Sequence, residues 1–127
     1  MKLSCGCLNI QIHTEGNPTS KNADPIPDFI GSTFNSIVDL HKAIPSLVLT
    51  KTVNQFKVVA CLVCFLNVYC YTAENTNTLI VNNLALRDKA IDQLKLHADY
   101  SSIFQIKIPY NEFNSETGTG FCICISF

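Results

Sequence analysis

The sequence predicts an α+β domain: a mainly antiparallel sheet with two amphipathic helices. Short segments rich in Val, Ile, Phe and Tyr are typical of strands, and two other segments space their apolar residues as a helix does. The segments follow the order β, α, β, β, β, α, β, β, and strands joined by short links usually pair antiparallel. We expect residues 1–127 to form a single domain, either complete or the N-terminal part of a longer chain.

The first third of the chain contains one predicted strand and one predicted helix. Apolar and polar residues alternate over 8–12, which predicts a half-buried strand. Residues 14–28 are polar and contain three prolines, so a loop is expected there. Ser32 is a suitable cap for a helix over 32–43, which Pro45 would end. The apolar face of that helix would be Phe34, Ile37 and Val38.

The rest of the chain is predicted to be mostly strand. A dense apolar region predicts strands over 47–52, 56–72 and 78–81, with a turn at 73–77. A second helix is expected over 84–98, with Asp88 early and Lys95 late, as the helix dipole favours. Two more strands are expected at 103–108 and 121–127, separated by a polar loop.

Composition points to a protein partner. Apolar residues make up 47% of the chain and charged residues 15%, against about 25% in an average domain. A surface so poor in charge is either small or partly covered by another protein or a second copy of the chain. Net charge is −1 and the Lys and Arg residues are scattered singly, so nucleic acid is not an expected partner.

The sequence also predicts a compartment. The longest apolar run, 58–71, is shorter than the roughly 20 residues that a membrane span needs. The N-terminus lacks the apolar core of a secretory leader, and the cysteine count is odd. We therefore expect an intracellular protein, cytoplasmic or nuclear, whose thiols are free or metal-bound.

Six of the seven cysteines form close pairs, and the pairs allow three interpretations. They are Cys5/Cys7, Cys61/Cys64 and Cys122/Cys124, with Cys70 alone. Structural zinc needs four ligands, usually supplied as two chelating pairs, and the first two pairs would suit. Alternatively, the apolar run around 61–64 buries its thiols as small hydrophobes. A redox role would need an exposed, electropositive setting, which the flanking residues do not provide.

The third cysteine pair and the histidines define no catalytic site. Cys122 and Cys124 share one face of their predicted strand, where they would either complete a site with Cys5/Cys7 or lie in the core. His13 is a spare ligand or a surface residue, and His41 and His97 fall on the predicted helices. No histidine stands at a recognisable spacing from a nucleophile.

Two fragments resemble the Mss4-like (β-tent) superfamily, which includes the glutathione-dependent formaldehyde-activating enzymes. In that family a CxC opens a strand and a later CxxC follows an aromatic-led strand, as residues 4–12 and 56–64 do here. The resemblance implies a structural zinc on Cys5, Cys7, Cys61 and Cys64. The enzymes carry a further cysteine cluster between these motifs. This chain has none there, so their thiol chemistry is not carried over.

Three functions follow as expectations. The first is a non-catalytic intracellular domain that binds another protein, or a subunit of a complex, through strand addition or an exposed helix face. The second is a zinc-stapled Mss4-like protein, and this interpretation includes a divergent thiol-dependent enzyme. The third is a longin-like or profilin-like trafficking or scaffold module, which rests on the order of the elements alone.

Overall fold

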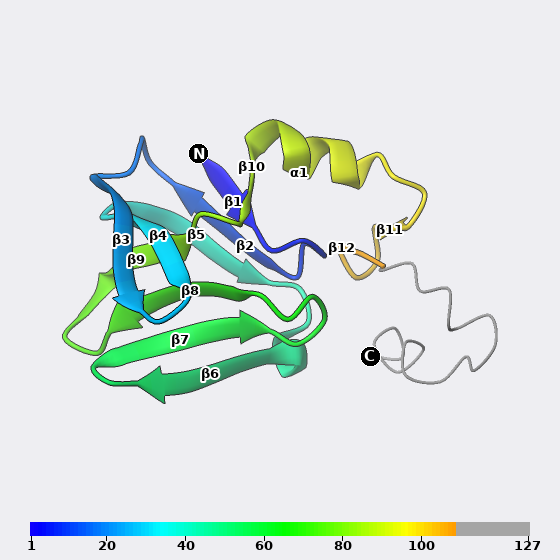
Figure 1. The fold of residues 1–127 in the computed structure, drawn as a ribbon. Coiled ribbons are helices and arrows are strands. Elements are labelled where there is room, and N and C mark those ends of the chain that lie inside the picture. Colours follow the sequence, from blue (N-terminus) through cyan, green and yellow to red (C-terminus); the bar gives the residue numbers. More distant parts are fainter. Residues whose placement is uncertain (109–127) are drawn as a thin grey trace.

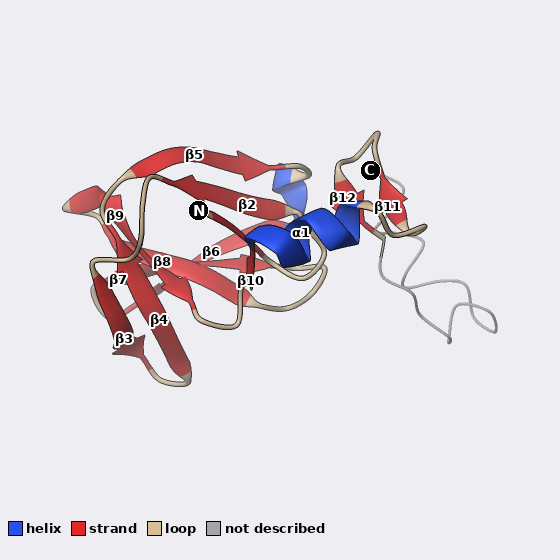
Figure 2. Cartoon of the chain, turned by 90° about the horizontal axis from the view of Figure 1, so that it is seen from above, coloured by secondary structure: helices blue, strands red, loops and turns tan. Residues whose placement is uncertain are grey.

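The computed structural model describes residues 1–108, which fold into two facing antiparallel sheets and one short helix (Figures 1 and 2). The four-stranded sheet has the order β10-β1-β2-β5. Its strands are β1 (Lys2–Ser4), β2 (Ile10–Thr14), β5 (Ile37–Lys42) and β10 (Leu86–Arg87). Figure 2 shows β2 and β5 on one side of the molecule and β3, β4 and β7 on the other.

The second sheet has six strands in the order β3-β4-β9-β8-β7-β6. They are β3 (Ser20–Ile26), β4 (Phe29–Phe34), β6 (Val48–Val53), β7 (Phe56–Cys61), β8 (Asn67–Thr72) and β9 (Asn75–Asn82). The remaining elements are a 3-10 turn η1 (Pro45–Leu47), the helix α1 (Asp88–Lys95) and the short hairpin of β11 (Tyr100–Ser101) and β12 (Ile106–Lys107).

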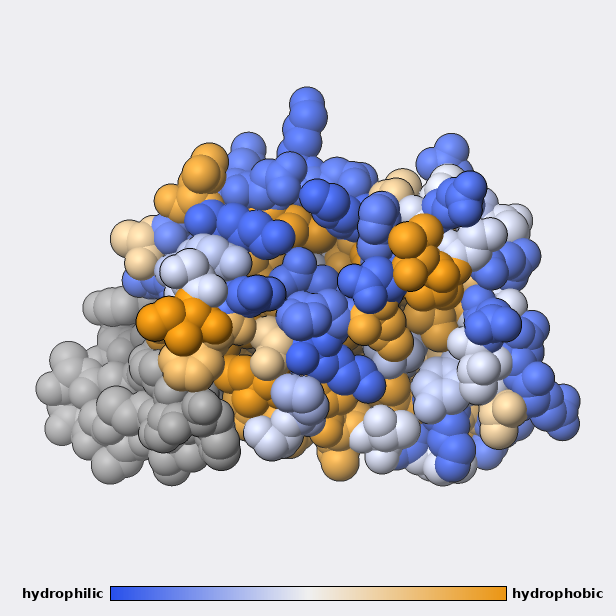
Figure 3. Space-filling view, turned by 180° about the vertical axis from the view of Figure 1, so that it is seen from behind, coloured by the Kyte–Doolittle hydropathy of each residue, from blue (hydrophilic) through white to orange (hydrophobic). Residues whose placement is uncertain are grey.

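The four-stranded sheet separates apolar and polar side chains by register. Leu3 pairs with Ile12, and both are buried in the core between the sheets. The neighbouring row pairs Lys2 with His13 and His13 with Asp39, and all three side chains are exposed on the opposite face. Figure 3 looks onto the side where β2 and β5 lie and shows hydrophilic side chains mixed with hydrophobic ones. The alternation thus leaves one polar and one apolar face.

The six-stranded sheet is apolar on both faces. One face contributes Phe34, Tyr69 and Val81 to the core between the sheets. The other face holds a second cluster, in which Val58 and Cys70 pack with Ile26 and Phe29 from the β3–β4 hairpin. This sheet is therefore buried on both sides along its middle strands, which explains why its sequence runs apolar without clean alternation.

The expected helix over 32–43 is wrong, and the fold has one short helix instead of two. Residues 29–34 form β4, which pairs with β9, and residues 37–42 form β5, which pairs with β2. The apolar residues of this segment fit two strands as well as they fit a helical face, and Ile37 and Val38 are β-branched. Pairing with distant strands favoured the two strands over the helix. Residues 1–108 therefore consist mainly of antiparallel sheet.

Several other boundaries differ from expectation. The loop expected at 14–28 contains β3, whose Pro25 is tolerated because β3 is an edge strand. The segment 56–72 is two strands, β7 and β8, separated by a turn that carries Cys64. The strand expected at 103–108 shrinks to β12, whereas the strand expected at 121–127 lies outside the described residues.

The second predicted helix exists in shortened form as α1. Asp88 stands in its first turn, where its Oδ1 accepts a hydrogen bond from the backbone N–H of Lys2 at 2.9 Å, and Lys95 stands in its last turn. Ile91 is its buried residue, so the helix attaches to β1 by a narrow apolar contact. No helix in residues 1–108 has the length and apolar character to cross a membrane.

Candidate metal centre

Four cysteines from two distant turns meet at one end of the two sheets. Cys5 and Cys7 lie in the turn between β1 and β2, whereas Cys61 ends β7 and Cys64 follows in the turn to β8. The Cys7 Sγ is 3.6 Å from the Cys5 Sγ and 3.4 Å from the Cys61 Sγ. All four sulfur atoms lie within 4.8 Å of one another. Figure 1 shows both turns at the same end, next to β12.

The two turns share a backbone arrangement. The residue after the second cysteine donates its N–H to the carbonyl of the first, from Leu8 to Cys5 at 3.1 Å and from Phe65 to Cys61 at 2.9 Å. Both of these residues have left-handed backbones, with φ of 68° at Leu8 and 60° at Phe65. This conformation is unusual for an apolar side chain. It reverses the backbone at each turn, so that the two sulfur atoms of a cysteine pair face the same point.

Backbone N–H groups also point at the sulfur atoms. The Ile10 N–H donates to the Cys5 Sγ at 3.3 Å. On the other turn, the Cys5 thiol is the main cause that lowers the pKa of Cys61 and that of Cys64. A backbone hydrogen bond from Cys64 adds to the lowering at Cys61, and one from Leu66 adds to it at Cys64. Hydrogen bonds donated to sulfur favour the thiolate, which is the form that binds metal.

The four thiols share hydrogen bonds, so the pKa values of some are lowered while those of others are raised. Hydrogen bonding from Cys5 lowers the pKa of Cys61 to about 7 and places the pKa of Cys64 well below its ordinary value. The pKa of Cys5 is raised by its contact with Cys61, and that of Cys7 by its contact with Cys5. Four thiolates cannot crowd together without a compensating charge, and a divalent cation supplies it.

The donor set and spacing fit tetrahedral zinc. A Zn–S distance of about 2.3 Å places the sulfur atoms of a regular tetrahedron about 3.8 Å apart. The separations of 3.4 and 3.6 Å and the overall limit of 4.8 Å need only small shifts to reach this. They are far longer than a disulfide bond, and the five described cysteines are free. Soft sulfur ligands select zinc over the hard cations.

The centre is nearly closed. Cys5, Cys7 and Cys61 are buried, and Cys64 is half-buried. A hollow of about 240 Å³ beside Cys64 is lined by Gly6, Cys7, Val63, Cys64 and Lys107. The backbone N–H of Lys107 donates to the Cys7 carbonyl at 2.6 Å, so the segment around β12 covers one side of the cluster.

The structure brings together the four cysteines proposed as ligands and leaves the other candidates elsewhere. Among residues 1–108 no other group of three or more His, Cys, Asp or Glu side chains is close enough to hold a metal ion. Cys70 lies alone in the second apolar cluster, as expected of a core thiol. His13 is exposed on β2, His41 is on β5 rather than on a helix, and Cys122 and Cys124 lie outside the described residues.

Sequence reasoning missed three contributors to the centre. Leu8 and Phe65 adopt the left-handed conformation that closes each turn, although their side chains do not favour it. Their position directly after each cysteine pair was the available signal. Lys107 covers the cluster through its backbone, which no side-chain pattern reveals.

No protein-family model matches this chain, and no curated protein and no solved structure matches it either. The family is therefore not identified. What the structure shares with the β-tent resemblance is a mostly antiparallel sheet fold and a cluster of four cysteines.

Proposed function

We propose that this chain is a non-catalytic binding domain, stapled by one zinc ion on Cys5, Cys7, Cys61 and Cys64, that associates with another protein. The observation that carries the proposal is the convergence of four sulfur atoms within 4.8 Å from turns on two different sheets. Such a centre joins the sheets at one end and leaves the rest of the surface for recognition.

The composition of the centre favours a structural ion over a catalytic one. Catalytic zinc keeps three protein ligands and an open position for water or substrate, whereas four protein ligands fill a tetrahedral site. A thiol enzyme would also need a reactive cysteine outside the metal. Cys70, the one other described cysteine, is buried, and burial raises its pKa to about 12. A thiol in that state is a poor nucleophile.

The surface supports a protein partner. Several large apolar side chains are more than half exposed: Ile30, Val38, Phe65, Leu84, Leu96 and Ile103. The outer strands β5 and β6 each expose four consecutive residues and, among residues 1–108, each pairs with a neighbouring strand on one side only. Exposed apolar side chains and open strand edges are the features that partner proteins cover.

Metal content tests the zinc part of the proposal. The full chain is purified without chelator or histidine tag and analysed by elemental mass spectrometry, with about one zinc per chain as the expected result. Cobalt(II) exchanged into the centre should give the absorption of a tetrahedral sulfur site, and a Cys5→Ser variant should lose it. A folded, metal-free protein whose stability does not respond to added zinc would contradict the proposal.

A further inference from the structure

A groove of about 680 Å³ lies beside the start of β4 and the end of β9. Its lining combines the apolar side chains of Ile30 and Leu84 with the carboxylates of Asp24 and Asp28. The volume is in the range of ligand-binding sites. The zinc centre does not explain this groove, because none of its cysteines lines it.

The apolar side chains of the groove lie where the core between the sheets becomes exposed to solvent. Ile30 is on the same side of β4 as Phe34, since side chains four residues apart along a strand face the same way. Phe34 is 1% exposed in the core between the sheets, whereas Ile30 is 54% exposed and Leu84 is 77% exposed. Two aliphatic side chains therefore stand open to a partner at the rim of a buried core.

The floor of the groove is fixed by hydrogen bonds. The Asn83 N–H donates to the Ile30 carbonyl at 2.9 Å, and the Ser32 hydroxyl lies 2.7 Å from the Asn83 Oδ1. The Leu84 N–H donates to the Asn82 Oδ1 at 2.9 Å. A segment held in this way is already arranged for binding, so a ligand loses little by ordering it.

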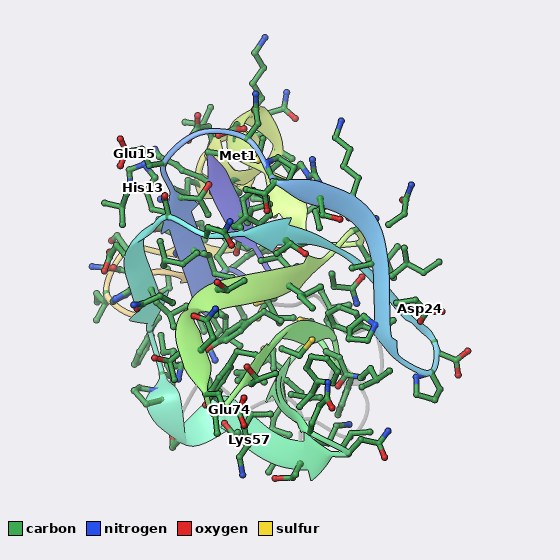
Figure 4. All side chains as sticks on the ribbon, turned by 90° about the vertical axis from the view of Figure 1, so that its left-hand side faces the viewer. Met1, His13, Glu15, Asp24, Lys57 and Glu74 are labelled. Atoms are coloured by element: carbon green, nitrogen blue, oxygen red, sulfur yellow. The ribbon has the colours of Figure 1, made fainter. Side chains whose placement is uncertain are left out.

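The charge of the groove is negative and uncompensated by its own lining. Asp24 and Asp28 are exposed, and none of the described residues that line the groove is a Lys, Arg or His. Within residues 1–108 the close contact between a basic and an acidic side chain joins His97 to Asp99, and neither Asp24 nor Asp28 has such a contact. Figure 4 shows Asp24 on the β3–β4 side, away from His13 and Met1.

We infer that this groove binds a partner segment that carries a Lys or Arg next to an aliphatic side chain. The aliphatic side chain, with the methylene stem of the cation, packs on Ile30 and Leu84 while the cationic group reaches Asp24 and Asp28. The inference deepens the proposed function, since it rests on a protein partner and names the face and the chemistry of recognition.

The opposite face offers an internal comparison. A smaller hollow of about 330 Å³ on the outer side of β2 is lined by Lys2, His13, Asp39 and Lys95 among others. Its cations outnumber its carboxylate, so it would repel a basic segment that the acidic groove attracts. Asp39 therefore serves as the matched control carboxylate for substitutions in the groove.

The test selects peptides from a phage library of random linear sequences on the zinc-loaded full chain. Selected peptides are then titrated into the ¹⁵N-labelled protein. We expect peptides that pair a Lys or Arg with Leu, Ile or Val, and amide shifts centred on Ile30, Asn83 and Leu84. The double variant Asp24→Asn with Asp28→Asn should weaken binding about fivefold, and Asp39→Asn should leave it unchanged. Both changes keep side-chain size.

The other outcomes are distinct. Peptides that are acidic, or that shift amides of β5 or β6 instead, would overturn the groove and leave a protein-binding function standing. Selection of no peptide would count against partner binding as well as the groove, whatever the zinc content. A Leu84→Ser variant that binds as tightly as the unaltered chain would remove the apolar half of the inference.

Discussion

The two ends of β7 are turned by different means. Before β7 the chain reverses at Asn54, whose φ is 56°, and after β7 it reverses at Phe65, whose φ is 60°. Asparagine visits the left-handed region readily, whereas a bulky apolar residue does so at a cost of roughly 1–2 kcal/mol. The first turn is thus specified by its own residue, and the second by the cysteines around it.

Leu8 repeats the pattern of Phe65 on the other cysteine turn. Two such residues together cost roughly 2–4 kcal/mol, whereas a structural zinc ion contributes about 10–16 kcal/mol of apparent binding free energy. A bound zinc ion would thus offset the strain at the cysteine end, whereas the turn at Asn54 needs no such compensation. Substitutions at the two ends should therefore differ most where a cysteine is removed.

The largest effect is expected from Cys61→Ser. Loss of one ligand should release the metal and unfold the domain, because the contribution of structural zinc is comparable to or larger than the usual 5–15 kcal/mol of total stability. Circular dichroism melting and zinc content measure the two outcomes. The matched control is Cys70→Ala, a buried thiol outside the cluster, which should keep its zinc and lose about 1 kcal/mol. Equal stability of the two variants would mean that the cluster is ordinary core.

Gly31→Ala should destabilise the fold away from the cysteines. A Cβ at Gly31 would lie 2.7 Å from both the Val81 carbonyl oxygen and the Ile80 Cγ2, and the backbone oxygen cannot move aside cheaply. We expect a loss of about 1–3 kcal/mol, read from urea unfolding. Gly6→Ala is the control, because among residues 1–108 no atom beyond its two chain neighbours lies within 4 Å of the position that a Cβ would take there. A larger loss at Gly6 would contradict the packing of β4 against β9.

The left-handed residues give a pair of variants with opposite signs. Phe65 is 83% exposed, so Phe65→Gly removes strain without removing burial and should stabilise the zinc-loaded protein by about 0.5–1 kcal/mol. Leu8 is 0% exposed, so Leu8→Gly loses about 2 kcal/mol of burial and should destabilise it. Thermal melting of both variants decides the matter. Destabilisation by Phe65→Gly would show that the turn bears no strain.

The last prediction concerns alkaline pH. Burial raises the pKa of Cys70 to about 12 in the folded protein, above the 8.5 or so of an unfolded thiol. The folded state therefore holds its proton more tightly, and its stability should fall as the pH rises from about 9 towards 12. Unfolding free energies at pH 8 and pH 10 would show a shallower fall for Cys70→Ala. Burial raises the pKa of Tyr69 similarly, which leaves a residual slope in that variant.

The candidate site was easier to predict than the fold. The cysteine pairs are local patterns that suit zinc, so Cys5, Cys7, Cys61 and Cys64 could be named as a candidate set without knowing the topology. Buried core thiols, or a site shared with Cys122 and Cys124, were the alternatives. The helix predicted over 32–43 was wrong because the apolar spacing of this segment suits a helix and a pair of strands equally. Pairing with strands far along the chain determines which of the two forms. The left-handed backbones of Leu8 and Phe65 were not predicted, because their residue types argue against that conformation and only their position after each cysteine pair pointed to it.

The distance along the chain between the cysteine pairs has a consequence for the order of assembly. Cys7 and Cys61 are 54 residues apart, and closing a loop of that length costs roughly 3.5 kcal/mol beyond a constant. A chain emerging during synthesis cannot complete the cluster until Cys64 has appeared, by which point β1 to β7 are already made. Metal capture would then come late and act as a check on folding, since a tetrahedral site forms only when both sheets have found their places.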